Sequence, residues 1–361
     1  MIPRVVAIGP LPPPVHGYSL ITSLVIERLR RTAGVEVFDV SSGKLVRGWR
    51  YHWTRLRRVL SALTKLVLRR PQGDALYLAI AGGAGITYDI AFAALGRWRG
   101  YRLFIHHHSF GYIDRRGRCA AALIAIAGAN ATHVCLCPTM AERLAQQYAR
   151  VRRTLVLSNA ALIAPTQERP RRRSGGHLSL GFISNLIPEK GLDIAVEVLQ
   201  RLHEMESDVA LIVAGPALDP GTQRFLADAG RRFGNALDYR GAVYDAAKLA
   251  FFRDVDVLLF PTRYANEAQP LVAFEAMGHG IPVIATGRGC IPEDLVAGGM
   301  VVFPEDDFVA AAVTTVRGWL SDPGKLNALA AAAAARANEM FGAAQCDLER
   351  IVARLTRSDE I

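Results

Sequence analysis

Residues 266–286 read Asn-Glu-Ala-Gln-Pro-Leu-Val-Ala-Phe-Glu-Ala-Met-Gly-His-Gly-Ile-Pro-Val-Ile-Ala-Thr, and this stretch decides the fold. A polar loop leads to Pro270, which the first turn of a helix tolerates, so residues 271–278 are a predicted helix. Gly278 and Gly280 end that helix, and residues 281–285 are a nearly all-apolar strand, typical of a buried parallel sheet. Anions bind where helices start beside strand ends in such sheets. The stretch therefore predicts an anion site, with Glu267 before the helix and Glu275 inside it.

Short apolar strands and helical segments alternate along the rest of the chain. Such alternation is typical of α/β proteins with parallel, doubly wound sheets. The polar segment 164–176 is broken by proline and glycine and predicts a linker. We therefore expect two Rossmann-like domains, at residues 1–168 and 175–342. Strands are expected at residues 5–8, 35–40, 75–79, 103–106, 133–137 and 154–157, and then at 178–183, 210–214, 237–240, 257–260, 282–285 and 300–303.

Several blocks of the sequence resemble one family. They are residues 266–286 and Leu-Gly-Phe-Ile-Ser-Asn-Leu-Ile-Pro-Glu-Lys-Gly at 180–191, with weaker matches at 9–19, 106–108 and 211–215. Together they resemble the retaining glycosyltransferases of the GT-B fold, in the group called family 4. The resemblance implies two Rossmann-like domains that face a central cleft, and a C-terminal helix at about 343–361 that packs back on the first domain.

The resemblance assigns the two glutamates to the sugar-nucleotide donor. Glu275 is similar to the glutamate that accepts hydrogen bonds from the donor ribose, and a carboxylate can accept from two hydroxyls at once. Glu267 is similar to the glutamate beside the transferred sugar, where negative charge favours an oxocarbenium-like transition state. The alternative is a pair of solvated surface carboxylates.

The donor diphosphate is expected to meet positive charge from two sources. Lys190 matches the lysine that neutralises the leaving group. The start of the predicted helix would add its N-terminal dipole and its free amides, from the loop made by Ala268, Gln269, Pro270 and Leu271. At Asn185 the chain departs from the family, which usually has an arginine there, so another cation such as Arg288 is needed or the diphosphate contact is weaker.

In the first domain the resemblance points to Gly17 and to the histidines that end a strand. Gly17 is similar to a glycine that lets the backbone approach the ligands. His108, and after it His107, are the candidates to contact the reaction centre, because alternation lets at most two of residues 106–108 face one side. No Asp, Glu or Cys partner follows at metal-ligand spacing, so no metal is expected. Asp254-Val255-Asp256 mimics a metal motif of another glycosyltransferase fold, but we expect it at a helix-to-strand junction.

Basic residues are concentrated in the first half. Residues 1–175 hold 27 Lys and Arg against 8 Asp and Glu, whereas residues 176–361 hold 16 against 25. Residues 47–70 contain eight basic residues and no acid, with Trp49, Trp53, Leu56, Leu60, Leu63 and Val67 on one helical face. Such a helix either lies on an anionic membrane or packs on its own sheet with solvated arginines, and the two can combine.

The sequence thus predicts a retaining, metal-independent glycosyltransferase without a cofactor. Its donor is expected to be a nucleotide-diphosphate sugar, and family frequency makes UDP the expected nucleotide. Its acceptor is expected to be a cell-envelope or lipid-linked glycan. The first residues lack a signal peptide and no run reaches about 18 apolar residues, so we expect a cytoplasmic protein, peripheral on the inner membrane face. The alternatives are a sugar-nucleotide epimerase and a basic module that binds nucleic acid or membrane; nucleic acid is not expected as a partner.

Overall fold

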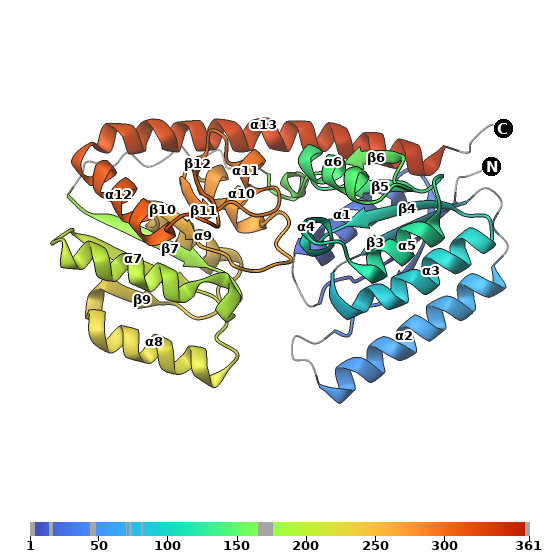
Figure 1. The fold of residues 1–361 in the computed structure, drawn as a ribbon, viewed down its shortest axis with the longest axis horizontal. Helices are drawn as coiled ribbons and strands as arrows, with labels where there is room; N and C mark the ends of the chain where they lie inside the picture. Colours follow the sequence, from blue (N-terminus) through green and yellow to red (C-terminus); the bar gives the residue numbers. More distant parts are fainter. Residues whose placement is uncertain are drawn as a thin grey trace. The chain divides into compact units, whose positions relative to one another are not determined.

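A computed structural model describes residues 4–13, 17–43, 48–69, 71, 74–80, 82–164 and 176–357. The chain divides into two compact units, unit 1 with residues 1–162 and 342–361 and unit 2 with residues 163–341. Each unit contains one six-stranded sheet covered by helices (Figure 1). The predicted fold class, two doubly wound α/β halves, is confirmed. Residues 165–175 of the predicted linker lie outside the described residues.

Unit 1 is built around strands that are parallel throughout, in the order β2-β1-β3-β4-β5-β6. The central strand β3 is buried at every residue, because helices cover both of its faces. Its strands are β1 (Arg4–Gly9), β2 (Gly34–Asp39), β3 (Ala75–Ile80), β4 (Arg102–His107), β5 (Thr132–Cys135) and β6 (Arg153–Val156). Its helices are α1 (Gly17–Arg30), α2 (Trp49–Leu68), α3 (Ile86–Trp98), α4 (Gly111–Asp114), α5 (Arg118–Ala127) and α6 (Pro138–Gln147).

Unit 2 repeats this plan with the strand order β12-β11-β10-β7-β8-β9. Its strands are β7 (Leu178–Ile183), β8 (Val209–Ala214), β9 (Leu237–Tyr239), β10 (Val257–Phe260), β11 (Val283–Thr286) and β12 (Gly299–Val302). Its helices are α7 (Leu192–Glu204), α8 (Pro220–Phe233), α9 (Asp245–Asp254), α10 (Leu271–Gly278), α11 (Ile291–Asp294) and α12 (Phe308–Ser321). The helix predicted at 271–278 is α10.

The strand order of unit 2 reverses between β7 and β10, which pair directly. In parallel sheets, ligands bind beyond the carboxyl ends of the strands at such a switch point. The loops that leave these two ends are residues 184–191 and 261–270. They contain Asn185, Lys190 and Glu267, so the sheet topology gathers the predicted residues at one edge.

Helix α13 (Pro323–Thr356) belongs to both units, since the boundary falls at residue 342. Within unit 1 its last turns bury Leu348, Ile351 and Leu355. Gln345 Nε2 donates to the carbonyl of Ala161 at 2.9 Å, which fixes this end of the helix against the segment that follows β6.

The face of helix α2 that packs on unit 1 differs from the apolar stripe described above for residues 49–67. Its buried residues are Val59, Ala62 and Leu66, which lie about 100° around the helix from the stripe. Trp49 and Trp53 of the stripe are 74% and 56% exposed. Of the two alternatives that the sequence leaves open, packing on the sheet does not describe the tryptophans of the stripe, which face solvent.

The physical reason is polar contacts on the buried side of α2. Arg58 pairs with the carboxylate of Asp39 and donates to the carbonyl of Ser41 at 3.0 Å. Arg55 lies 5.3 Å from the centre of the Tyr88 ring. These contacts turn two of the basic residues toward the unit. None of the described helices is long and apolar enough to cross a membrane.

Candidate functional site

The site begins with an ion pair between Lys190 and Glu267, which lie 77 residues apart in the sequence. Lys190 Nζ lies 2.5 Å from Glu267 Oε2, and Thr262 Oγ1 donates to the same oxygen at 3.1 Å. Glu267 is only 8% exposed, so its charge needs such partners. The lysine nitrogen also lies 5.5 and 5.0 Å from the ring centres of Phe260 and Tyr264. The structure thus brings two of the predicted site residues together and holds the lysine over two aromatic faces.

Two features hold the loop of Lys190 against the loop of Glu267. Gly191 has φ +82°, and a Cβ atom there would lie 2.2 Å from the carbonyl oxygen of Pro261, so only glycine fits. Arg263 forms two hydrogen bonds to the Asp193 carboxylate, at 2.9 and 2.8 Å, and one to the carbonyl of Pro188 at 2.8 Å. Arg263 and Thr262 were not predicted from the sequence as site residues, although both lie within three residues of the end of β10, the strand that leads to the predicted motif.

Glu275 lies on α10 and pairs with a lysine from α9. Lys248 Nζ is 2.5 Å from Glu275 Oε1. The other carboxylate oxygen, Oε2, is buried and has no hydrogen-bond partner within the described part of the chain. A buried carboxylate oxygen without a donor is costly, so this atom is suited to accept a hydrogen bond from a ligand hydroxyl. Lys248 was also missed, because no motif marks a lysine 27 residues before its partner.

Some polar groups just before α10 already form hydrogen bonds within the protein. Gln269 Nε2 donates to Asp294 Oδ1 at 2.9 Å, and the carbonyl of Ala268 accepts from the amide of Cys290 at 2.8 Å. Pro270 is the N-cap and has no N–H to offer. Leu271 begins the helix, so its amide has no acceptor within α10. The structure therefore gives the Gln269 side chain a structural partner, and the Leu271 amide is the candidate anion-binding group of this loop.

Asp294, the partner of Gln269, is almost fully buried at 3% exposure. Burial raises its pKa to about 8, although the hydrogen bond from Gln269 acts in the opposite direction. At neutral pH the Asp294 carboxyl is therefore mainly protonated. It supports the loop without adding negative charge beside an expected diphosphate.

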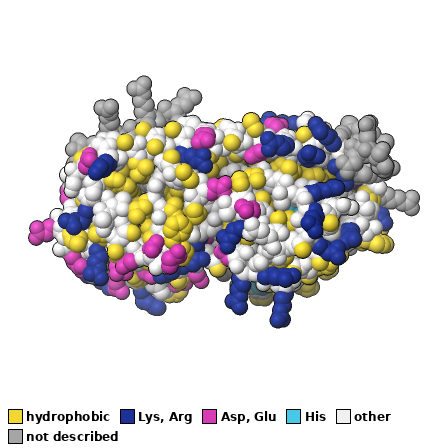
Figure 2. Space-filling model, turned by 45° about the horizontal axis from the view of Figure 1, so that its top comes forward, with side chains coloured by type: hydrophobic (Ala, Val, Ile, Leu, Met, Phe, Trp, Pro, Cys, Tyr) yellow, Lys and Arg dark blue, Asp and Glu magenta, His cyan; other side chains and the backbone are white. Residues whose placement is uncertain are grey.

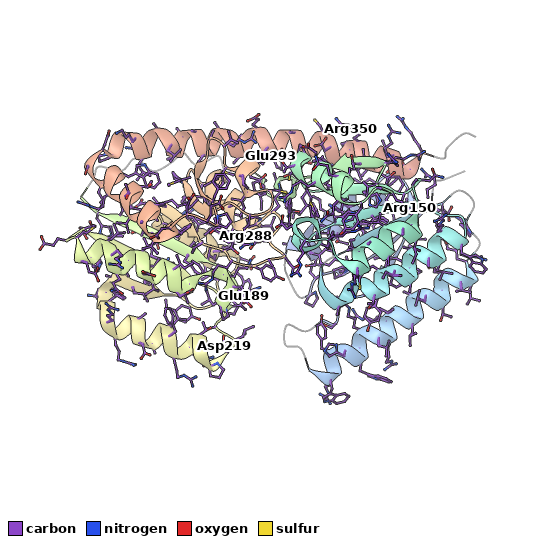
Figure 3. All side chains as sticks on the ribbon, viewed as in Figure 1. Arg150, Glu189, Asp219, Arg288, Glu293 and Arg350 are labelled. Atoms are coloured by element: carbon purple, nitrogen blue, oxygen red, sulfur yellow. The ribbon has the colours of Figure 1, made fainter. Side chains whose placement is uncertain are left out.

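Arg288 is a cation without a counter-charge near the same loop. It follows β11, and Gly289 next to it has φ +59°, with a Cβ position 2.4 Å from the carbonyl oxygen of Ala268. The Arg288 side chain makes no hydrogen bond or ion pair among the described residues, and its Nε is buried. Figure 3 labels Arg288 within unit 2. Asn185, after β7, is exposed, and its carbonyl accepts from the amide of Ile187 at 2.8 Å. Arg288 is thus available to supply the charge that Asn185 lacks.

The histidines of unit 1 that end β4 are closed into the interior. His106 Nδ1 is 2.6 Å from Tyr77 Oη; His107 Nδ1 is 2.9 Å from Tyr112 Oη, and His107 Nε2 is 2.9 Å from His133 Nδ1. Burial lowers the pKa of His106 to about 3 and that of His133 to about 4, and it lowers the pKa of His107 as well. His107 is fully buried with both ring nitrogens engaged, so the structure gives this predicted catalytic residue a structural role.

His108 and Gly17 are placed at the same edge of the sheet of unit 1. His108 is half-buried, its amide donates to the carbonyl of Ile80 at 3.0 Å, and its ring centre lies 4.7 Å from that of Tyr18. Gly17 is the first residue of α1, directly after residues 14–16, which lie outside the described residues. His108 remains the candidate histidine and Gly17 the candidate glycine.

The Asp-x-Asp sequence at 254–256 lies where it was expected, between α9 and β10. Asp254 pairs with Arg240 at 2.7 Å, and Asp256 Oδ2 accepts from the amide of Ser179 at 2.9 Å. Among the residues that the structure describes, no three His, Cys, Asp or Glu side chains are grouped so that they could hold a metal ion. Both aspartates thus stabilise the strand junction.

Comparison with known proteins finds a family match within unit 2. Residues 177–333, which include Lys190, Glu267 and Glu275, match the family described as Glycosyl transferases group 1. This part of the chain is therefore similar to the group 1 glycosyl transferases. The group 1 match covers the switch point and both lysine–glutamate pairs.

Two curated relatives are similar over part of their length. The chain is 31% identical over 176 residues to a glycogen synthase of Mycobacterium tuberculosis, which covers 47% of this chain and 41% of that protein. It is 26% identical over 223 residues to the gpi3 subunit of phosphatidylinositol N-acetylglucosaminyltransferase of Schizosaccharomyces pombe, covering 59% of this chain and 47% of that protein. The match thus spans less than half the length of these two relatives.

Solved structures match over nearly the full chain. Anabaena Alr3699/HepE in complex with UDP has a TM-score of 0.69 at 16% identity, covering 98% of this chain and 99% of that one. Sucrose-phosphate synthase from Thermosynechococcus elongatus has a TM-score of 0.74 at 16% identity, with the same coverage. At this identity the likeness shows the fold, and the chain has the GT-B fold predicted from its sequence.

Proposed function

We propose that this protein is a retaining glycosyltransferase that moves a sugar from a nucleotide-diphosphate donor to an acceptor hydroxyl. The observation that carries the proposal is the pair of partly buried lysine–glutamate contacts near the switch point, within the segment that matches the group 1 family. An ordinary structural ion pair would satisfy all its polar atoms, whereas Glu275 keeps one buried oxygen without a donor. That oxygen accepts from a ribose hydroxyl of the donor.

The diphosphate of the donor lies against three sources of positive charge. Lys190 supplies one cation, and Arg288 supplies a second in place of Asn185. The first-turn amides of α10 supply the positive end of a helix dipole. When the donor binds, its phosphate oxygens compete with Glu267 for the Lys190 ammonium, which frees the glutamate to accept from a sugar hydroxyl.

The reaction follows from these contacts. The bond between the anomeric carbon and the leaving phosphate oxygen breaks, the acceptor oxygen bonds to the same face of that carbon, and the acceptor proton passes to the leaving phosphate. Positive charge develops at the anomeric carbon, and the Glu267 carboxylate stabilises it. The leaving diphosphate gains negative charge, which Lys190 and Arg288 stabilise without a metal ion. Retention of the anomeric configuration is the outcome.

The acceptor is proposed to be a lipid-linked or cell-envelope glycan, reached at the inner face of the cytoplasmic membrane. Support comes from the exposed tryptophans of α2, Trp49 and Trp53, on a helix without acidic residues. The name of the gpi3 relative refers to a phosphatidylinositol substrate, and a structural neighbour binds UDP. UDP is therefore the nucleotide that we propose for the donor.

The test is a transfer assay with UDP, GDP, ADP and TDP sugars and lipid-extract acceptors. The donor sugar is α-linked to the phosphate, and NMR of the product gives the new anomeric configuration. An α-linked product, formed in the presence of EDTA, is the expected result. A β-linked product would overturn retention, and release of an epimerised sugar nucleotide without transfer would favour the epimerase alternative.

A further inference from the structure

A second basic site lies in unit 1, at the amino-terminal edge of its sheet. A cavity of about 850 Å³ is formed there by the starts of β4, β5 and β6 and the ends of α3, α5 and α13. No carboxylate lines it. We call it the arginine cavity, because six arginines line it: Arg97, Arg102, Arg152, Arg153, Arg354 and Arg357.

Two of these arginines have a structural task. Arg97 Nη1 donates to the carbonyl of Ile126 in the last turn of α5, at 2.8 Å. Arg102 donates to the carbonyls of Arg354 and Leu355 in the last turn of α13, at 3.2 and 3.0 Å. Carbonyls at helix ends lack intrahelical donors, and cations stabilise them. The helix ends therefore explain two of the six positive charges.

The other four arginines have no such explanation. Within the part of the chain that the structure describes, the side chains of Arg152, Arg153, Arg354 and Arg357 make no hydrogen bond or ion pair. Some arginines elsewhere in unit 1 pair with carboxylates, and others, such as Arg30 and Arg31, are exposed singly on the surface. The pairs include Arg28 with Glu349, Arg58 with Asp39, Arg69 with Asp74 and Arg143 with Asp114. Four like charges around one cavity repel each other, so the cavity is suited to an anion that supplies the missing charge.

We propose that the arginine cavity binds a ligand that carries two or more phosphate groups. The planar guanidinium matches phosphate oxygens with two parallel hydrogen bonds, and four free guanidinium groups exceed what one phosphate needs. Asn130, Thr132 and Thr154 in the wall add amide and hydroxyl groups. The volume suits a small molecule or a lipid headgroup. Both sources share the phosphate chemistry.

The arginine cavity is separate from the candidate site residues of unit 1. His108 follows the carboxyl end of β4, whereas Arg102 begins that strand. Six residues of strand span about 17 Å from end to end. The donor residues belong to unit 2. The inference is therefore independent of the proposed function, and a ligand in the cavity does not displace a nucleotide sugar.

The test measures binding of pyrophosphate to the full chain by titration calorimetry. Cosedimentation measures binding of vesicles of phosphatidylcholine with or without cardiolipin, a lipid that carries two phosphates. The cavity variant is R153Q/R357Q, which leaves the two capping arginines in place. The control is R30Q/R31Q, which removes two exposed positive charges at the end of α1, outside the cavity. Circular dichroism of each variant checks that the protein is folded.

We expect pyrophosphate to bind the wild type and the control equally, and the cavity variant at least about tenfold more weakly. A loss of cardiolipin binding in the cavity variant alone identifies a lipid headgroup as the source, and a loss confined to pyrophosphate identifies a free anion. Equal binding by the cavity variant and the control in both arms would overturn the proposal. An oligonucleotide that binds more tightly than pyrophosphate, and only when the cavity is intact, would replace the small anion by a nucleic acid.

Discussion

In unit 2 the carboxyl edge of the sheet carries two lysine–glutamate pairs, whereas in unit 1 the same edge carries buried histidines and tyrosines. Burial lowers the pKa of these histidines, so they are neutral at physiological pH. One fold, used twice, thus gives one edge that keeps charge and one that excludes it. The charged edge of unit 2 suits a diphosphate and a ribose. The neutral edge of unit 1 consists of buried side chains that hydrogen-bond to each other.

The comparison also explains which motifs were informative. Each glutamate pairs with a lysine, because one lies in the loop after a strand end and the other on the helix that follows, and their roles toward a donor stay predictions. In the sequence, the histidines at 106–108 were equally good candidates for a catalytic site, but the fold buries His106 and His107. The predictions below test the charged edge and the neutral edge in turn.

The largest effect is expected for E267Q. The amide keeps the size of the side chain but removes the charge that stabilises the anomeric carbon, so kcat should fall by about 10²–10³. Initial rates at saturating donor measure it. The control is E189Q, which removes an exposed carboxylate next to Lys190 in the sequence. Nearly full activity in E267Q would show that this glutamate serves the structure alone.

A second prediction concerns Asp294, whose pKa rises from an ordinary 3.8 to about 8 on folding. Between these values the folded state holds a proton that the unfolded state has lost. The contribution to stability is complete below pH 4 and is lost as the pH rises toward 8. From pH 5 to pH 8 the wild type should lose about 3 kcal/mol more unfolding free energy than D294N. Denaturant titrations measure it, and D306N, at an exposed site, should follow the wild type.

The neutral edge of unit 1 should respond to acid in the opposite sense. His133 has its pKa lowered from 6.5 to about 4, so below pH 6.5 the unfolded state takes up a proton that the folded state refuses. Stability from this group is present above pH 6.5 and is lost as the pH falls toward 4. Between pH 6.5 and 4.5 the free energy of unfolding of H133N should fall by about 2 kcal/mol less than that of the wild type. The exposed His52 gives the control, H52N, and an unchanged acid slope in H133N would mean that His133 is not neutral.

A smaller effect is expected for E275Q, in which the affinity for the donor nucleotide should fall. The amide still accepts one hydrogen bond but loses the charge, so Kd for the nucleoside diphosphate should rise about tenfold. Calorimetry measures it, with E305Q as a control at an exposed carboxylate of the same unit. If both variants bind alike, Glu275 does not contact the nucleotide.

The smallest effect on stability is expected on α2. W49S/W53S should change the unfolding free energy by no more than about 0.5 kcal/mol, because both rings are exposed. V59S, at a buried position of the same helix, should cost more, since it places a hydroxyl in the core. Denaturant titrations compare the two. A large loss in the tryptophan variant would mean that the stripe packs on the protein after all.

The fold was predictable because its signals are local. Apolar runs such as residues 257–260 and the proline and glycines around 270–280 fix strands and helices by near neighbours. The pairing of Lys190 with Glu267, and of Lys248 with Glu275, depends on which strands meet at the switch point, and strand order is not a local property. The same holds for α2, where Asp39 on a neighbouring strand decides which face is buried.

The measurement that tests the central claim most directly is thermal unfolding of the wild type and E275Q with UDP, GDP, ADP and TDP. We expect one nucleoside diphosphate to raise the melting temperature of the wild type, and we expect E275Q to lose most of this shift. No shift with any of the four at millimolar concentration would contradict a nucleotide-sugar site at the charged edge of unit 2.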